Sequence, residues 1–154
     1  MMKKLIPLLC FFLIVVSSCK KDSFNAAVQA ANDDATIQAY IKANSLTDVV
    51  KDPSGLYYKV VTPGIGKYPD AAATVTVNST GKLTDGTIFD TETALTIPLT
   101  NVIRGWQLGL PHINNGGRIL LLIPSSLGYG NTANGGIPKN SVLIFTVDML
   151  SFVN

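Results

Sequence analysis

The sequence contains few of the residues on which metal sites and disulfides depend. Its 154 residues include two cysteines and one histidine. Cys10 lies inside an N-terminal apolar run that is expected, as argued below, to be cleaved off, which leaves only Cys19. A lone cysteine forms neither an internal disulfide nor a cysteine metal site, and a lone histidine disfavours a histidine zinc site. We therefore expect no metal and no other cofactor.

An excess of charge of one sign is also absent. Twelve basic residues stand against ten acidic ones, and two of the basic residues, Lys3 and Lys4, precede the apolar run. Without these two lysines the charges balance, and no basic run follows Lys20 and Lys21. Because binding to a phosphate backbone requires clustered positive charge, nucleic acid is not an expected partner.

The first residues, MMKKLIPLLCFFLIVVSSC, have the features of a secretion signal. Two lysines precede an apolar stretch from Leu5 to Val16, and small residues follow it. This stretch would span about 18 Å as a helix, which is short of the roughly 30 Å hydrocarbon core of a bilayer. The pattern therefore predicts a signal peptide over residues 1–18 and not a membrane span.

The ending VSSC, residues 16–19, resembles the lipobox of bacterial lipoproteins. In that motif the cysteine is acylated and becomes the first residue of the mature protein, which implies lipid on Cys19. Each buried methylene of such a lipid contributes about 0.8 kcal/mol to membrane binding. We therefore expect a protein of the cell envelope that is lipid-anchored to a membrane, on its periplasmic or surface face. The alternative is ordinary secretion, with Cys19 as a free thiol.

Residues 19–51 are predicted to form a tether and one short helix. The stretch KKDSFNAAVQAANDD is polar and alanine-rich, and indicates a tether or a loosely helical arm. The following DDATIQAYIKAN has apolar side chains at helical spacing, namely Ile37, Tyr40 and Ile41. The candidates for the N-cap of this helix are Asn32, Asp33 and Asp34.

Residues 52–154 are predicted to form an α+β domain with a mostly antiparallel sheet. Five runs are rich in Val, Ile, Thr and aromatic residues: 56–62, 73–80, 95–99, 118–124 and 141–150. Turn signals such as PGIG, NNGG and NGGIP separate these runs, and no crossover helices alternate with them. The remaining helical candidate, RGWQLGLPHI, places Trp106, Leu110 and Ile113 on one face, so this helix could lie in the concavity of the sheet.

Two common kinds of active site are disfavoured. No nucleophile-elbow pattern surrounds Ser125, so a triad of this serine with His112 and an aspartate is not expected. The glycine-rich GYGNTANGG lacks both the lysine of a phosphate loop and the G-x-G-x-x-G spacing of dinucleotide-binding folds. What remains is a set of apolar and aromatic residues with one acid.

Four motifs, TGKLTDGTIFD, VIRGW, LGYG and IPKNSVLIFTVDML, follow one another between about Gly55 and Phe152. Together they resemble the FKBP-type peptidyl-prolyl isomerases. This resemblance implies a twisted antiparallel sheet of five or six strands wrapped around one short helix. It also implies catalysis of cis/trans rotation about the bond that precedes proline, so that the partners would be proline-containing polypeptide segments.

The resemblance implies a role for individual side chains. Trp106 would form the floor of the pocket under the prolyl ring, Tyr129 would reach the substrate carbonyl with its hydroxyl, and Asp90 would be the pocket carboxylate. The remaining pocket residues would be apolar: Phe89, Val102, Ile103 and Phe145 in the walls, and Ile137 at the tip of the loop before the last strand. The backbone N–H of Ile103 would donate to the bound ligand.

This chemistry suits a site without a nucleophile or a metal. Rotation about a peptide bond must break amide resonance, with a barrier of roughly 18 to 20 kcal/mol, and takes tens of seconds or more before proline. A dry pocket can favour the twisted amide, whose charge separation is smaller, while a hydroxyl holds the carbonyl in place.

The sequence departs from the family pattern at Ser79, where members usually have a tyrosine that is hydrogen-bonded near the pocket acid. Serine loses the ring and the reach, which predicts a roomier pocket and reduced activity. The leading hypothesis is a lipid-anchored rotamase that assists the folding of exported proteins. A catalytically weak binding or chaperone lipoprotein with the same fold is the alternative. A purely structural envelope lipoprotein would require the pocket to be filled.

Overall fold

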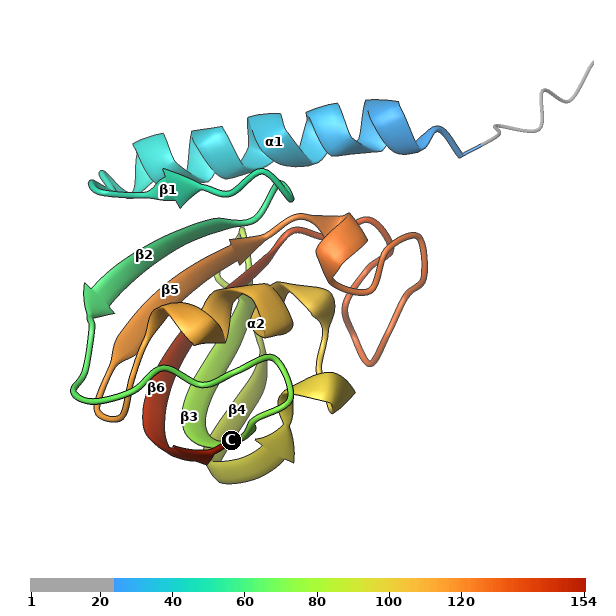
Figure 1. Cartoon of the computed structure of the whole chain (residues 1–154). Helices are drawn as coiled ribbons and strands as arrows, with labels where there is room; N and C mark the ends of the chain where they lie inside the picture. The colour runs from blue at the N-terminus through green and yellow to red at the C-terminus, as the bar shows by residue number, and fades with distance from the viewer. Residues whose placement is uncertain (1–23) are drawn as a thin grey trace, which may run out of the picture.

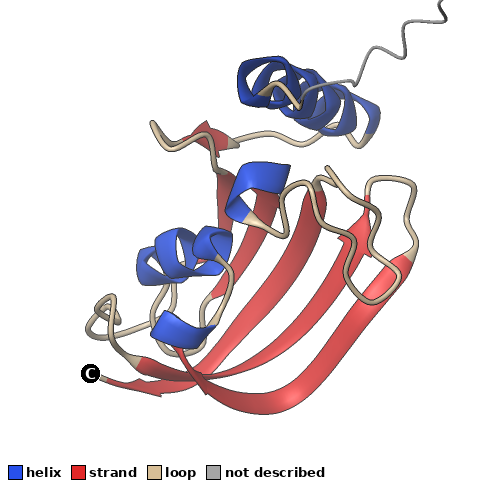
Figure 2. Cartoon of the chain, turned by 90° about the vertical axis from the view of Figure 1, so that its right-hand side faces the viewer, coloured by secondary structure: helices blue, strands red, loops and turns tan. Residues whose placement is uncertain are grey.

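The structure is a computed structural model that describes residues 24–154. The predicted signal peptide and Cys19 therefore lie outside the described residues. Six antiparallel strands form one twisted sheet in the order β1-β2-β5-β6-β3-β4. Helix α2 lies in the hollow of the sheet, and helix α1 runs across one end of it (Figures 1 and 2). The predicted α+β fold, with one short internal helix and an N-terminal helix, is confirmed.

The strands agree with the predicted runs except at the two edges of the sheet, β4 and β1. Their bounds are β1 Val50–Lys51, β2 Tyr57–Thr62, β3 Thr74–Leu83, β4 Ile88–Pro98, β5 Arg118–Ile123 and β6 Leu143–Val153. Strand β4 begins well before the predicted run 95–99. Its first half contains the polar residues 90–93, so the sequence pattern did not predict that half. Since β4 pairs only with β3, it is an edge strand whose polar side chains can face solvent. The short strand β1 was not predicted.

The concave face of the sheet holds the main core. Buried positions alternate along β3 and β6. They pack with Trp106 of α2 and with Leu110 and Ile113, which follow α2 and were predicted to share a face with Trp106. Helix α2 spans Arg104–Gly109 and continues into a 3₁₀ turn over Leu110–His112. A Cβ on Gly109 would lie 2.4 Å from a methyl carbon of Leu121, so the glycine lets this helix sit directly on β5.

The N-terminal helix α1 spans Ala26–Ala43, so the predicted N-cap at Asn32, Asp33 or Asp34 is wrong. Asn25 is the N-cap instead, because its side-chain oxygen accepts hydrogen bonds from the backbone N–H groups of Ala27 and Val28. The alanine-rich residues 26–31 then extend the helix, since alanine has the highest helix propensity. Within the segment interpreted as a tether or a loosely helical arm, residues 26–34 are thus regular helix.

A second, smaller core fixes α1 to the outer face of the sheet. Ile37 is fully buried there, in a cluster with Tyr57, Leu122, Val142 and Ile144. These strand residues alternate with residues of the main core, so the sheet is covered on both faces at this end. No helix of residues 24–154 is both long enough and apolar enough to cross a membrane.

Candidate functional site

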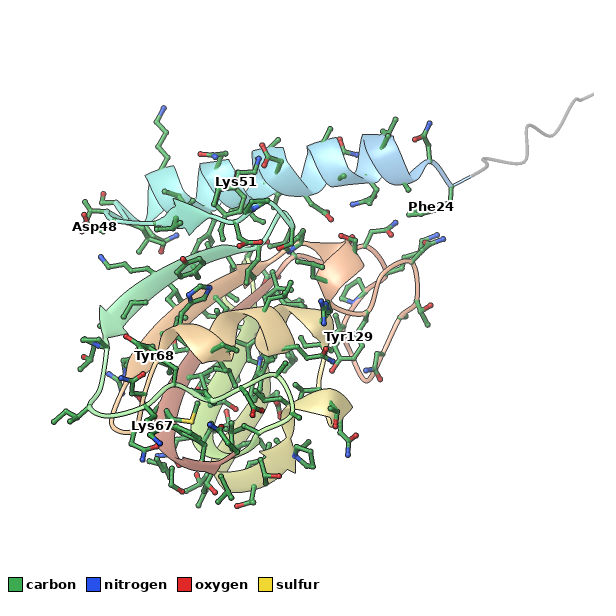
Figure 3. The ribbon with its side chains drawn as sticks, in the orientation of Figure 1. Phe24, Asp48, Lys51, Lys67, Tyr68 and Tyr129 are labelled. Carbon is green, nitrogen blue, oxygen red and sulfur yellow. The ribbon has the colours of Figure 1, made fainter. Side chains whose placement is uncertain are left out.

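Residues from two distant parts of the chain line one small cavity. The cavity has a volume of about 230 Å³ and is lined by Phe89 and Asp90 of β4 and by Tyr129, Asn134, Gly135 and Ile137. The last four residues belong to the loop between β5 and β6, on which Figure 3 labels Tyr129. Four residues that the sequence assigned to the site therefore share one cavity. Tyr129 is 36% exposed at this cavity, whereas Ile137 is buried.

Three aromatic rings connect this cavity to the core. The ring of Phe145 meets the ring of Trp106 edge to face, with centroids 5.3 Å apart and an interplanar angle of 87°. On its other side it meets Phe89, with centroids 5.5 Å apart and an angle of 81°. Edge-to-face contacts of this kind are a favoured aromatic arrangement. The structure thus brings Trp106, Phe145 and Phe89 together, as the sequence predicted.

Gly81 on β3 makes this aromatic contact possible. It pairs with Asp90 on one side and with Phe145 on the other. A Cβ at this position would lie 2.6 Å from a ring carbon of Phe145 and 2.7 Å from one of Phe89. Sequence reasoning gave Gly81 no role, although a glycine inside a strand often marks the close approach of another group. Only a residue without a side chain fits beneath the two rings.

Val102 and Ile103 lie just before α2 and are half-buried against the main core. Ile103 is the N-cap residue, and its C=O accepts hydrogen bonds from the N–H groups of Trp106 and Gln107 at 3.0 and 3.3 Å. The first N–H groups at a helix start have no acceptor inside the helix. Donation from the Ile103 N–H to a ligand stays a prediction, and its position is compatible with that role.

The loop that carries Ile137 ends in a tight turn. The backbone groups of Asn134 and Ile137 bond to each other in both directions, at 3.0 and 2.8 Å. This turn, over residues 134–137, places the apolar Ile137 and the polar Asn134 at the same cavity. One wall of the cavity is therefore set by backbone hydrogen bonds and not by side-chain packing alone.

Ser79 is buried on the concave side of β3, two residues before Gly81. Its hydroxyl has no hydrogen-bond partner among the described residues, so it does not contact the carboxylate of Asp90. A buried polar group without a partner costs about 1 to 3 kcal/mol. The contact between residue 79 and the pocket acid, which the family pattern implies for a tyrosine, is therefore missing.

A larger cavity lies elsewhere. It has a volume of about 550 Å³ and lies between α1 and residues 51–55. None of the predicted site residues lines it. Among residues 24–154, no group of three or more His, Cys, Asp or Glu side chains could hold a metal ion. The cavity at Tyr129 is the better candidate site, because four residues that the sequence assigned to the site line it and an aromatic cluster adjoins it.

A twisted sheet wrapped around a short helix, with an aromatic cavity beside the helix, defines a class of protein. Residues 66–150 match the family model of the FKBP-type peptidyl-prolyl cis-trans isomerases. The chain belongs to this family.

Individual relatives agree with this assignment. The chain is 41% identical over 126 residues to the isomerase FkpA of Escherichia coli K12, covering 79% of this chain and 47% of the relative. It is 40% identical over 119 residues to FkpA of Aeromonas hydrophila, covering 74% and 44%. The chain thus spans about half the length of the curated relatives it matches.

Solved structures show the same fold. The crystal structure of E. coli FkpA matches with a TM-score of 0.72 and 38% identity, over 82% of this chain and 62% of that one. A peptidyl-prolyl isomerase from Pseudomonas syringae pv. tomato matches with a TM-score of 0.73 and 27% identity, over 86% of this chain and 98% of that one.

Substituting Gly81 by alanine tests the role of the aromatic contact. The new methyl group collides with the rings of Phe89 and Phe145, so we expect a loss of stability of about 1 to 3 kcal/mol. We also expect the cavity to change shape and the binding of a proline peptide to weaken. Urea denaturation and peptide titration measure the two effects. Thr80→Ala, at the neighbouring position, is the control, and equal effects of both variants would contradict this role.

Proposed function

We propose that this protein is a peptidyl-prolyl cis-trans isomerase that acts on exposed proline-containing segments of exported proteins. The observation that carries the proposal is the cavity in which Tyr129, Asp90 and Ile137 meet an aromatic cluster ending in Trp106. Membership of the isomerase family supports the same reaction. The roles assigned below to individual residues are part of the proposal.

The geometry suggests how rotation is favoured. The prolyl ring would displace water from the space beside Phe89, whose ring contacts Phe145 and, through it, Trp106. Removing water favours the twisted amide over the planar one, since the planar form has the larger charge separation. The hydroxyl of Tyr129, at the mouth of the cavity, would hold the carbonyl before proline while the bond turns. Asp90 would supply the only carboxylate of the cavity lining.

A protease-coupled assay on an Ala-Leu-Pro-Phe peptide tests the reaction. We expect the full chain to accelerate isomerisation, and Tyr129→Phe to lower kcat/KM about tenfold, the effect of losing one hydrogen bond of about 1.4 kcal/mol. Tyr68→Phe is the matched control, because Tyr68 is exposed and does not line the cavity. Figure 3 labels both tyrosines. Trp106→Ala should abolish activity by removing the floor.

The same experiment separates the isomerase from a binding or chaperone protein with this fold. Trp106 is the only tryptophan of the chain, so its fluorescence reports on peptide in the cavity. A fluorescence shift without acceleration of isomerisation would contradict the enzyme and support the binding protein. The absence of both effects would support a structural role.

The buried serine motivates a second test of activity. Because Ser79 Oγ has no partner, Ser79→Tyr should restore a wall and a hydroxyl near Asp90, and raise kcat/KM several-fold. Ser79→Ala is the control. It should leave activity nearly unchanged and should not lower stability, since it removes a buried hydroxyl without a partner, which costs about 1 to 3 kcal/mol. If a folded Ser79→Tyr protein shows the same turnover as the unmodified chain, Ser79 does not limit activity.

We also propose that lipid on Cys19 anchors the protein to a membrane of the cell envelope, with residues before α1 as a spacer. The motif VSSC supports this proposal. Expression with labelled palmitate should label the unmodified protein and not Cys19→Ser, and globomycin should block its processing. An unlabelled, soluble product whose Cys19 reacts with thiol reagents would instead show ordinary secretion.

A further inference from the structure

The helix α1 contains one buried carboxylate that the proposed reaction does not use. Asp33 is 2% exposed. Its Oδ2 accepts hydrogen bonds from the backbone N–H of Ser125 at 2.8 Å and from the hydroxyl of Ser125 at 2.7 Å. Its Oδ1 accepts one from the side-chain amide of Gln29 at 2.7 Å. Since a buried carboxylate is costly unless it is hydrogen-bonded, these three bonds fix both its position and that of Ser125.

Ser125 in turn holds the backbone on both sides of Tyr129. Its carbonyl oxygen accepts hydrogen bonds from the N–H of Gly128 at 3.0 Å and from the N–H of Gly130 at 2.8 Å. The carbonyl oxygen of Gly130 accepts a further one from the N–H of Asn140 at 2.8 Å, which closes the loop that carries Ile137. A single residue, Ser125, therefore links the Asp33 carboxylate to the peptide units that flank Tyr129.

We propose that Asp33 is a positioning residue, which acts through Ser125 to hold Tyr129 in place at the cavity. Its catalytic consequence rests on the isomerase function proposed above. The N-terminal helix is then a functional part of the site and not only a connection to the domain. Holding Tyr129 in position affects the rate, because a reacting group displaced by about 1 Å can lose roughly a hundredfold in rate.

The helix provides a firm support for this contact. Ile37, one turn after Asp33, is fully buried against the outer face of the sheet. Asp33 therefore cannot withdraw from Ser125 without disrupting a packed core. The loop itself has little such support at Tyr129, whose side chain is 36% exposed. Its placement depends on the backbone bonds to Ser125.

The adjacent residue on the same helix offers a matched comparison. Asp34 accepts hydrogen bonds from Lys51 at 2.5 Å and from the hydroxyl of Tyr57 at 2.6 Å. These bonds with Lys51 and Tyr57 hold the pKa of Asp34 below its usual value. Figure 3 shows Lys51 between α1 and the sheet. Asp34 thus joins α1 to the domain as Asp33 does, but its hydrogen bonds go to Lys51 and Tyr57 and not to Ser125 or the loop of Tyr129.

Catalysis in the full chain tests the proposal through a double-mutant cycle. We expect Asp33→Ala to lower kcat/KM about tenfold, and to lower it little further when Tyr129 is already phenylalanine. Asp33→Asn keeps an acceptor for Ser125 and should recover most of the activity. Asp34→Ala should stay within about twofold of the unmodified chain. Additive losses for Asp33→Ala and Tyr129→Phe, or an equal loss for Asp34→Ala, would overturn the proposal.

If Asp33→Ala does not fold, Ser125→Ala serves in the same cycle. This variant loses only the hydroxyl bond and keeps the backbone bond to Asp33. We expect Ser125→Ala to lower kcat/KM about threefold in the unmodified chain, and to leave it unchanged when Tyr129 is already phenylalanine. A loss that persists in that background would count against the proposal.

Amide hydrogen exchange decides the question without reference to activity. In the full chain, Asp33→Ala or Ser125→Ala should speed exchange at Gly128 and Gly130, whereas Asp34→Ala should not. Unchanged exchange in both variants of the Asp33–Ser125 contact would overturn the positioning role. If the unmodified chain fails to catalyse isomerisation, the proposed function is wrong, and the exchange rates still show whether Asp33 holds the loop.

Discussion

The site depends on the close approach of Phe89 and Phe145 above the bare backbone of Gly81, and on the contact of Phe145 with Trp106. The sheet must curve tightly enough to enclose α2, yet it must leave a hollow where a ligand ring can enter. Edge-to-face packing meets both requirements, because Phe145 fills the space between the other two rings and leaves Phe89 facing the cavity. The residues around this cluster are then free to supply polar groups, and Tyr129 and Asp90 do so from two different segments.

The opposite face of the sheet serves a different purpose. There the packing of Ile37 against Tyr57 and Leu122 attaches a long helix to the ends of the strands. Two acidic residues of that helix make polar contacts of unlike kinds. Asp34 lies at the surface and pairs with Lys51, whereas Asp33 is buried and holds a loop. Exposed ion pairs contribute little to stability, while a buried, fully bonded carboxylate fixes one arrangement of the backbone.

Much of the fold could be read from the sequence because local patterns agree with the tertiary structure. Runs rich in Val, Ile, Thr and aromatic residues predicted the sheet, and the spacing of Trp106, Leu110 and Ile113 predicted its internal helix. The start of α1 could not be found in this way, since Asp33 looks like a cap when its partner Ser125, 92 residues away in the chain, is unknown. The polar half of β4 was missed for a related reason. Its strand conformation comes from pairing with β3 and not from its own composition.

The residues of the candidate site likewise divide into those that the sequence could predict and those that it could not. Motif order was enough to select Phe89, Asp90, Tyr129 and Ile137, which share the cavity. Gly81 and Ser125 went unassigned, because their importance arises from distances across the sheet and between α1 and a loop. A glycine and a serine carry no local signal that distinguishes such roles from an ordinary turn or surface position.

The strand order has a consequence for the folding of the sheet. Strand β6 follows the other five strands along the chain, but it lies between β5 and β3 in the middle of the sheet. It also contributes Phe145, on which the aromatic cluster is centred. While residues 143–153 are still being synthesised, the two halves of the sheet have no strand to join them. The aromatic cluster therefore stays incomplete until β6 has paired with β5 and β3.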